Sequence, residues 1–183
     1  MTLNESDTAT AHLTWDERWK SADGRAQWLT PETFVTAFAG TLPDPGRKRA
    51  LDLGCGVGRH ALYLAGLGFD THAVDGSAAG VEHLNAWAAR NGLPVDASVG
   101  MMTTLPFPDA HFDYVLSYNV IYHGDPDVVG ATVAEIRRVL KPGGFYQGTM
   151  LSKRHHKFGL GRRIARDTFV IDDDGDKDHP HLY

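Results

Sequence analysis

The sequence contains a single cysteine, Cys55, among 183 residues, so an internal disulfide and a zinc site built from several cysteines are both excluded. No apolar run is long enough to cross a bilayer, and the first residues lack the basic and apolar regions of a signal peptide. Basic residues are in the minority, 18 against 23 acidic, which argues against broad electrostatic binding of nucleic acid. We therefore expect a cytoplasmic protein that binds neither a membrane nor nucleic acid.

The composition, 42% hydrophobic and 22% charged, fits one globular domain with a sizeable core. We expect a disordered N-terminal tail at 1–13, a folded domain at 14–151, and a mobile lid or truncated C-terminal segment at 152–183. Residues 153–166 of that last segment carry basic residues without an acidic one, and 172–178 carry five aspartates. The sequence leaves the oligomeric state open.

The most informative stretch is RALDLGCGVGRH at 49–60. An aliphatic run ends at Leu53, glycines follow at 54, 56 and 58, and 61–65 then has a helical pattern. Strand, glycine-rich turn and helix in this order bring the backbone of a parallel α/β sheet against a nucleotide-like ligand. Further strands are expected at 70–74, 95–99, 112–118 and 145–150. The pattern therefore predicts an α/β fold with its ligand site at this turn.

Two details indicate the kind of ligand. Gly58 falls one residue before the third glycine of the dinucleotide fingerprint, a position that Arg59 occupies here. Asp52, at the carboxyl end of the strand, would repel a diphosphate but suits an ammonium or sulfonium group. The turn therefore favours a cationic ligand over a dinucleotide.

The segment Leu51–Gly58 resembles the first motif of class I S-adenosylmethionine-dependent methyltransferases. Trp15 and Trp19, spaced i and i+4 on one predicted helix face, are similar to the thiopurine- and tellurite-resistance-like small-molecule branch. The resemblance covers roughly residues 15–150 and implies a Rossmann-like parallel sheet with helices on both faces. Such proteins continue with another helix and two strands after strand five. We expect these C-terminal strands to be missing, or the sheet to be closed differently.

The resemblance also implies which residues hold the cofactor, S-adenosyl-L-methionine, whose product is S-adenosyl-L-homocysteine. Asp75 follows the first glycine by about 20 residues, where a carboxylate accepts hydrogen bonds from ribose hydroxyls, although ordinary turn or cap duty is its alternative. At Met101 the usual acidic acceptor for the adenine amino group is replaced, and Gly76 replaces a larger apolar residue. The tryptophan pair could form core or a lid over the methionine end. The expected cofactor-binding set is Trp15, Trp19, Asp52, Gly54, Gly56, Asp75, Gly76, Met101, Met102 and Tyr118.

The expected reaction is methyl transfer to a small-molecule acceptor with an oxygen, nitrogen, sulfur or chalcogen nucleophile. His123 is the first candidate for a general base and Tyr122 the second, with packing at a strand end as the alternative for both. A soft acceptor needs little base catalysis. Two other functions stay open: a non-catalytic domain that binds the cofactor for regulation, and a nicotinamide-dependent oxidoreductase.

We expect no metal site. His155, His156, His179 and His181 could ligate a metal, but their polar surroundings favour flexible surface histidines. The aspartates at 172–178 lack the spacing and the terminal glutamate of an EF-hand, so calcium is the weaker interpretation there.

Overall fold

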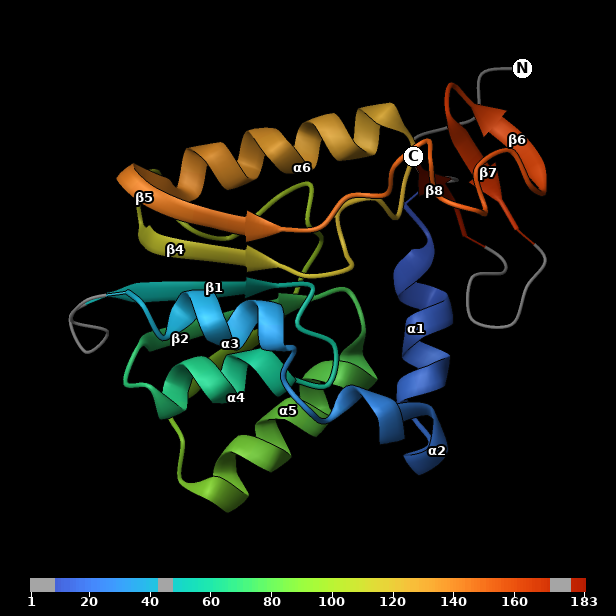
Figure 1. Cartoon of the computed structure of the whole chain (residues 1–183). Helices are drawn as coiled ribbons and strands as arrows, with labels where there is room; N and C mark the ends of the chain where they lie inside the picture. The colour runs from blue at the N-terminus through green and yellow to red at the C-terminus, as the bar shows by residue number, and fades with distance from the viewer. Residues whose placement is uncertain (1–8, 43–47, 172–178) are drawn as a thin grey trace.

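The computed structural model describes residues 9–42, 48–171 and 179–183. Its main sheet has five parallel strands in the order β3-β2-β1-β4-β5 (Figure 1). The strand bounds are β1 Arg49–Leu53, β2 Asp70–Asp75, β3 Val95–Val99, β4 Phe112–Ser117 and β5 Leu140–Gly148. The predicted parallel sheet is confirmed. The fifth strand, however, already begins at Leu140, because 141–144 bulge within the pairing to β4 instead of turning outside the sheet.

Helices cover both faces of this sheet, as predicted (Figure 1). The helix α6 packs on one face, and α3, α4 and α5 pack on the other, while α1, α2 and the short 3₁₀ helix η2 lie beyond the carboxyl ends of the strands. The helix bounds are α1 Ala11–Trp19, α2 Ala22–Arg25, η2 Ala26–Trp28, α3 Thr33–Ala39, α4 Arg59–Gly66, α5 Ala78–Asn91 and α6 Pro126–Val139.

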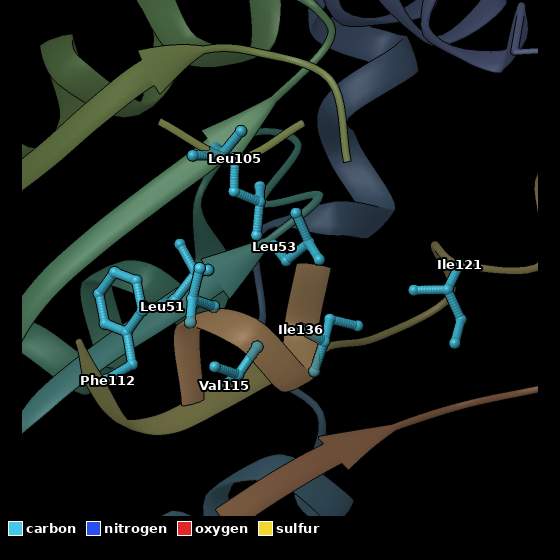
Figure 2. Close-up of a cluster of buried hydrophobic side chains, with 9 residues drawn as sticks. Leu51, Leu53, Leu105, Phe112, Val115, Ile121 and Ile136 are labelled. Atoms are coloured by element: carbon cyan, nitrogen blue, oxygen red, sulfur yellow. The ribbon is translucent and has the colours of Figure 1, made fainter. Parts of the chain in front are cut away.

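Alternation along β1 divides the core into two layers. Leu51 and Leu53 point toward α6, where they meet Val115 and Ile136 (Figure 2), whereas Ala50 points to the layer of α3 and α4. Successive side chains of a strand lie on opposite faces, so a strand buried on both sides reads as a continuous apolar run. This is why the buried part of β1, residues 50–53, contains no polar residue except Asp52.

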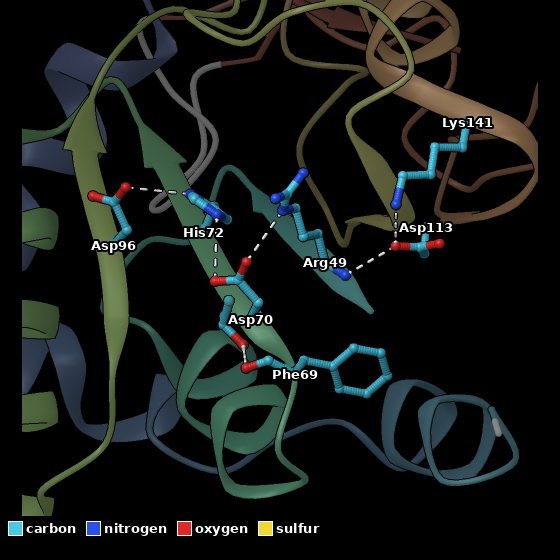
Figure 3. A network of polar contacts seen from close by, with 8 residues as sticks. Arg49, Phe69, Asp70, His72, Asp96, Asp113 and Lys141 are labelled. Atoms are coloured by element: carbon cyan, nitrogen blue, oxygen red, sulfur yellow. Dashed lines mark hydrogen bonds and ion pairs between the residues drawn. The ribbon is translucent and has the colours of Figure 1, made fainter. Parts of the chain in front are cut away.

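Ion pairs gather at the amino ends of the strands (Figure 3). The side chain of Arg49 pairs with Asp70 across β1 and β2 at 3.2 Å, and Lys141 pairs with Asp113 across β5 and β4 at 2.7 Å. The backbone N–H of Arg49 also donates to Asp113 at 3.0 Å. These contacts hold the edge opposite to the glycine turn, so the carboxyl ends of the strands stay available for a ligand.

The chain after β5 forms a second, three-stranded antiparallel sheet in the order β6-β7-β8. Its strands are β6 Arg162–Ala165, β7 Thr168–Val170 and β8 His181–Leu182. They lie in the segment for which we expected a lid or truncated segment, while the five aspartates at 172–178 lie outside the described residues. At the other end, α1 begins at Ala11, before the expected domain start at residue 14.

None of the described helices is both long and apolar enough to cross a membrane.

Candidate functional site

A cavity opens at the carboxyl ends of β1 and β4, where the strand order reverses. Open α/β sheets bind their ligands at such a switch point. With the solvent at its mouth included, the space measures about 950 Å³. Its walls come from α1, η2, the glycine turn and the loops after β2, β3 and β4: Ala9, Ala11, His12, Trp15, Trp19, Trp28, Leu53, Gly54, Cys55, Gly56, Val57, Arg59, His60, Val74, Asp75, Gly76, Gly100, Met101, Met102, Thr103, Tyr118, Asn119, Val120, His123 and Val128.

The glycine turn forms the floor of this cavity, and each of its glycines has a positive φ. A Cβ on Gly54 (φ 71°) would meet Val120 Cγ2 at 2.3 Å, and one on Gly58 (φ 95°) would meet Leu84 Cδ1 at the same distance. A Cβ on Gly56 would lie 3.3 Å from the Trp19 ring. The three glycines therefore let the main chain pass close to the loop after β4, to α5 and to the Trp19 ring.

Asp75 lies at the end of β2 and holds the turn in place. One carboxylate oxygen accepts the backbone N–H of Gly56 and the other that of Ser77, both at 2.7 Å. Burial raises the pKa of Asp75, while these two hydrogen bonds lower it. Each oxygen keeps a further lone pair for a ligand, because a carboxylate offers about four acceptor sites.

The helix α1 supplies an aromatic wall. Trp15 and Trp19 stack with their ring centroids 5.0 Å apart, and Trp28 packs edge-on against both at 5.2 and 5.6 Å. Asp16, on the same helix, accepts the Ser77 hydroxyl and the Ala79 backbone N–H, both at 2.8 Å. The helix is thereby fixed to the start of α5, and both predicted tryptophans line the cavity.

Asp52 is placed differently from the other predicted ligands. It lies beneath the glycine turn, is 1% exposed and is not among the described residues that line the cavity. The Ala61 backbone N–H donates to its carboxylate, whose Oδ2 makes no hydrogen bond within the described part of the chain. Burial, with a smaller contribution from the negative charge of Asp75, raises the pKa of Asp52 to about 7. An influence on a ligand therefore has to pass through the turn.

The replacement Asp52→Asn tests this burial. Because the folded chain holds the Asp52 proton more tightly than the unfolded chain, this group stabilises the fold below about pH 4, and the stabilisation is lost as the pH rises to about 7. The loss amounts to about 1.4 kcal/mol per pH unit across that window. We expect the free energy of unfolding of the ligand-free variant to equal that of the wild type at pH 4. At pH 8 it should be higher than that of the wild type by a few kcal/mol. Urea unfolding at both pH values measures this difference.

The exposed Asp23 on α2 provides the control, since Asp23→Asn should leave the pH profile of the wild type unchanged. The variant has to be compared with the wild type at each pH, because His60 changes the free energy of unfolding with pH in the opposite direction. Burial and the Arg59 charge lower the pKa of His60 to about 3, so its contribution to stability is lost as the pH falls from 6.5. Equal profiles of Asp52→Asn and the wild type would contradict the raised pKa of Asp52.

The sequence interpretation missed Arg59 and His60, which directly follow the glycine turn and line the cavity. The Arg59 guanidinium donates to the Thr30 carbonyl and to Glu32, and it lies 5.1 Å from the Trp28 ring. His60 Nε2 accepts the Glu32 backbone N–H at 3.2 Å. Their position at the first turn of a helix after a glycine loop could have signalled them. Arg59 is already engaged with Glu32, so it does not offer an unshared charge for a diphosphate.

The side of the cavity expected to hold adenine is formed by the ends of β2 and β3. A Cβ on Gly76 would lie 2.5 Å from His12 Cβ, so α1 fills the space next to this glycine. Met101 and Met102 line the cavity, and Met102 also packs on the core beneath α6. The carboxylate that the resemblance would place at Met101 is replaced by a thioether, which leaves packing and backbone groups for recognition.

Tyr118 and His123 line the cavity from the end of β4, whereas Tyr122 is not among the described lining residues. The Tyr122 ring instead packs on the rings of His123 and His181, at 4.5 and 6.1 Å. His123 Nε2–H donates to the Asn119 carbonyl at 3.1 Å. Burial and the neighbouring His181 and His179 hold the pKa of His123 well below its ordinary value.

The prediction of flexible surface histidines was wrong for two of the four. His179 is 0% and His181 3% exposed, and both pack against His123. Their burial arises because β8 docks on the loop after β4, where the Leu182 N–H donates to the Tyr122 carbonyl. His155 is half-buried and His156 exposed, as polar surroundings predict for the latter.

The donor set of the cavity fits S-adenosylmethionine. The Asp75 carboxylate suits ribose hydroxyls, and the tryptophan faces suit a sulfonium, because a cation is attracted to the ring quadrupole. Gly54 and Gly56 line the cavity without side chains of their own, so the backbone of the turn is exposed to a ligand. The Asp52 carboxyl beneath the turn disfavours a diphosphate there to the extent that it is ionised.

Comparison with known proteins agrees with this fit. Residues 50–144 match the family model of the methyltransferase domain. The chain is 38% identical over 113 residues to a probable chloroplastic tocopherol O-methyltransferase from Oryza sativa, covering 58% of this chain and 30% of the relative. It is 35% identical over 106 residues to the uncharacterized methyltransferase YodH from Bacillus subtilis, covering 58% and 44%.

Among solved structures, the PH0226 protein from Pyrococcus horikoshii superposes with a TM-score of 0.58 at 31% identity, covering 70% of this chain and 58% of that one. The curated relatives given above are longer, and the chain spans less than half of each. The narrower thiopurine- and tellurite-type branch stays a prediction. Because the family model matches more than half of the chain, the chain belongs to the methyltransferase domain family, the class I S-adenosylmethionine-dependent methyltransferases.

Proposed function

We propose that this chain transfers the methyl group of S-adenosylmethionine to a small-molecule nucleophile. The observation that carries the proposal is the Asp75 carboxylate, which is tied to the glycine turn through Gly56 and faces a cavity walled by tryptophans. When bound, the cofactor supplies a methyl group that its sulfonium already activates. The task left to the protein is to hold the two reactants in line, which can supply a large part of the rate acceleration.

Each wall has a role in this proposal. Asp75 accepts hydrogen bonds from the ribose hydroxyls, and Gly54 and Gly56 admit the cofactor close to the backbone. Trp15 and Trp19 cover the methionine end and exclude water from it. Asp52 acts through the turn, where the ionised fraction of its carboxyl favours the ammonium group.

The acceptor side is the loop after β4. His123 faces the cavity as a neutral imidazole, and its depressed pKa makes it a weak base. A thiol or another soft nucleophile, which needs little base catalysis, therefore suits this loop better than an alcohol. We propose the cytoplasm as the compartment, since a chain with the single Cys55 needs no oxidising environment to form an internal disulfide.

The test is a pair of titrations followed by an activity screen. We expect S-adenosylmethionine to bind in calorimetry and NADH not to bind, because Asp52 and the early Gly58 both disfavour a diphosphate at this turn. Formation of S-adenosylhomocysteine is then followed with thiols, selenols, phenols and amines as acceptors. Binding of NADH without binding of S-adenosylmethionine would overturn the proposal. Tight cofactor binding without turnover of any acceptor would instead support the regulatory alternative, which no feature of the described site favours at present.

A further inference from the structure

Three buried histidine side chains meet beside the cavity, and the proposed methyl transfer gives a role to only one of them. We call His123, His179 and His181 the histidine cluster. Their ring centroids lie 5.0 Å (His123 to His179), 4.8 Å (His123 to His181) and 4.6 Å (His179 to His181) apart. One ring nitrogen of each can be chosen so that all three lie within 4.8 Å of one another.

The backbone brings these residues together. His181 lies in β8, and His179 precedes it by two residues across Pro180. Antiparallel pairing of Phe169 with His181 fixes β8 to β7. The Leu182 N–H donates to the Tyr122 carbonyl at 2.9 Å, which sets β8 beside the loop that carries His123 (Figure 1). The cluster is therefore positioned by main-chain contacts.

The tautomer of His123 suits a metal ligand. Its Nε2 faces the Asn119 carbonyl, which can only accept, so the proton resides on Nε2 and the lone pair on Nδ1. A ligating histidine commonly donates its other ring N–H to a backbone carbonyl in this way. His123 Nδ1 makes no hydrogen bond within the described residues, although the side chain is only 7% exposed. A buried nitrogen acceptor in this state is matched by a cation.

We propose that the histidine cluster is a binding site for a divalent transition metal, with Zn²⁺ as the ion that fits its chemistry best. Imidazole suits zinc, whereas Ca²⁺ and Mg²⁺ prefer oxygen ligands. Zinc sites with three protein ligands keep a fourth position for water or substrate. With Zn–N bonds of about 2.0–2.1 Å, the nitrogens of a tetrahedral site lie roughly 3.4 Å apart. The widest pair, at up to 4.8 Å, therefore has to close by about 1.4 Å at most. Rotation of the three side chains on binding has to supply this movement.

The location gives the site a possible use in the reaction. His123 lines the cavity, and the Trp15 ring lies 6.1 Å from the His123 ring and 6.4 Å from the His179 ring. A metal on the cluster therefore borders the space in which the proposed function puts the methyl acceptor. A thiol that coordinates such a metal would release its proton to solvent and become a thiolate, so His123 would not be needed as a base. This use rests on the proposed function, while the metal site itself does not.

The experiment measures zinc binding by the full chain without cofactor. Protein stripped with a chelator and dialysed is titrated with Zn²⁺ in a calorimeter, and the metal content is checked by mass spectrometry. We expect one equivalent to bind. His179→Gln and His181→Gln should each weaken binding at least tenfold, and the double variant should show no stoichiometric binding. His156→Gln, an exposed histidine outside the cluster, serves as the matched control and should bind as the wild type does.

The folding of each variant is verified by circular dichroism in the absence of metal. Should a variant fail to fold, the visible spectrum of Co²⁺ on the wild type decides, since four-coordinate cobalt with nitrogen ligands absorbs far more strongly than six-coordinate cobalt. Zn²⁺ should also raise the thermal midpoint of the wild type and not that of the double variant. Three outcomes would each contradict the metal site and leave the histidine cluster with a packing role alone. They are the absence of stoichiometric Zn²⁺ on the stripped wild type, unchanged binding by a folded double variant, and a six-coordinate cobalt spectrum. Failure of methyl transfer would leave these readouts unmoved.

Discussion

Gly54→Ala is expected to weaken S-adenosylmethionine binding at least a hundredfold and to lower the free energy of unfolding by about 2–4 kcal/mol. The new Cβ would lie 2.3 Å from Val120 Cγ2 and 2.4 Å from its Cγ1, on a residue with φ 71°. A positive φ costs an alanine about 1–2 kcal/mol, and inserting a methyl into a packed site costs typically about 1–3 kcal/mol. Val120 can yield only by moving the loop after β4, which lines the cavity.

Calorimetric titration measures the affinity and urea unfolding the stability. Gly66→Ala is the matched control, because Gly66 ends α4 with nothing within 4 Å of the added Cβ. It should bind the cofactor normally and gain about 0.4–1 kcal/mol of stability from the stiffer unfolded chain. Affinity of Gly54→Ala within threefold of the wild type would mean that the cofactor does not bind over this turn.

The parts of the site that could be predicted from the sequence are those fixed by local spacing and parallel topology. The glycine turn must follow its strand directly, and Asp75 ends the neighbouring strand, so the two meet at one edge of the sheet. The i, i+4 spacing of Trp15 and Trp19 needs only a helix to stack them. Each of these residues lies where its own secondary structure element and the strand order suffice to place it.

The remaining parts depend on contacts between segments far apart in the chain. In the sequence, His179 and His181 are polar residues next to a run of aspartates. Nothing in the neighbouring sequence indicates that β8 docks beside Tyr122. Only their alternate spacing hinted at a shared face. From the sequence, Asp52 is predicted to contact the ligand because it lies near the end of a strand. In the structure α4 covers it, and the Ala61 N–H donates to its carboxylate.

The start of α1 shows the same limit in another form. We expected a disordered tail up to residue 13, yet α1 begins at Ala11 and His12 packs on Gly76. Further along the same helix, Asp16 accepts hydrogen bonds from Ser77 and Ala79 at the start of α5. Polar groups that satisfy one another across elements cannot be told from solvated ones by composition. The resemblance implies a larger apolar residue at position 76. Here that position is Gly76, and His12 of α1 fills the space beside it.

Asp75→Asn is expected to weaken S-adenosylmethionine binding at least a hundredfold while the chain stays folded. The carboxylate accepts the N–H groups of Gly56 and Ser77 with separate oxygens. An asparagine has one oxygen, so its NH₂ group faces one of these N–H groups and can no longer accept from a ribose hydroxyl. Burial already raises the pKa of Asp75, so loss of its charge costs the free protein little, and we expect the free energy of unfolding to change by less than about 2 kcal/mol.

Asp125→Asn separates this effect from a loss of capping. Asp125 accepts the Asp127 and Val128 N–H groups at the start of α6, both at 3.0 Å, and is not among the described cavity residues. Asparagine caps a helix about as well as aspartate, so this variant should keep both affinity and stability. If Asp75→Asn is folded and binds as tightly as the wild type, the ribose contact does not exist. A hundredfold loss, about 2.7 kcal/mol, found at Asp75 and not at Asp125 would instead place the cofactor's ribose on the carboxylate that also fixes the glycine turn.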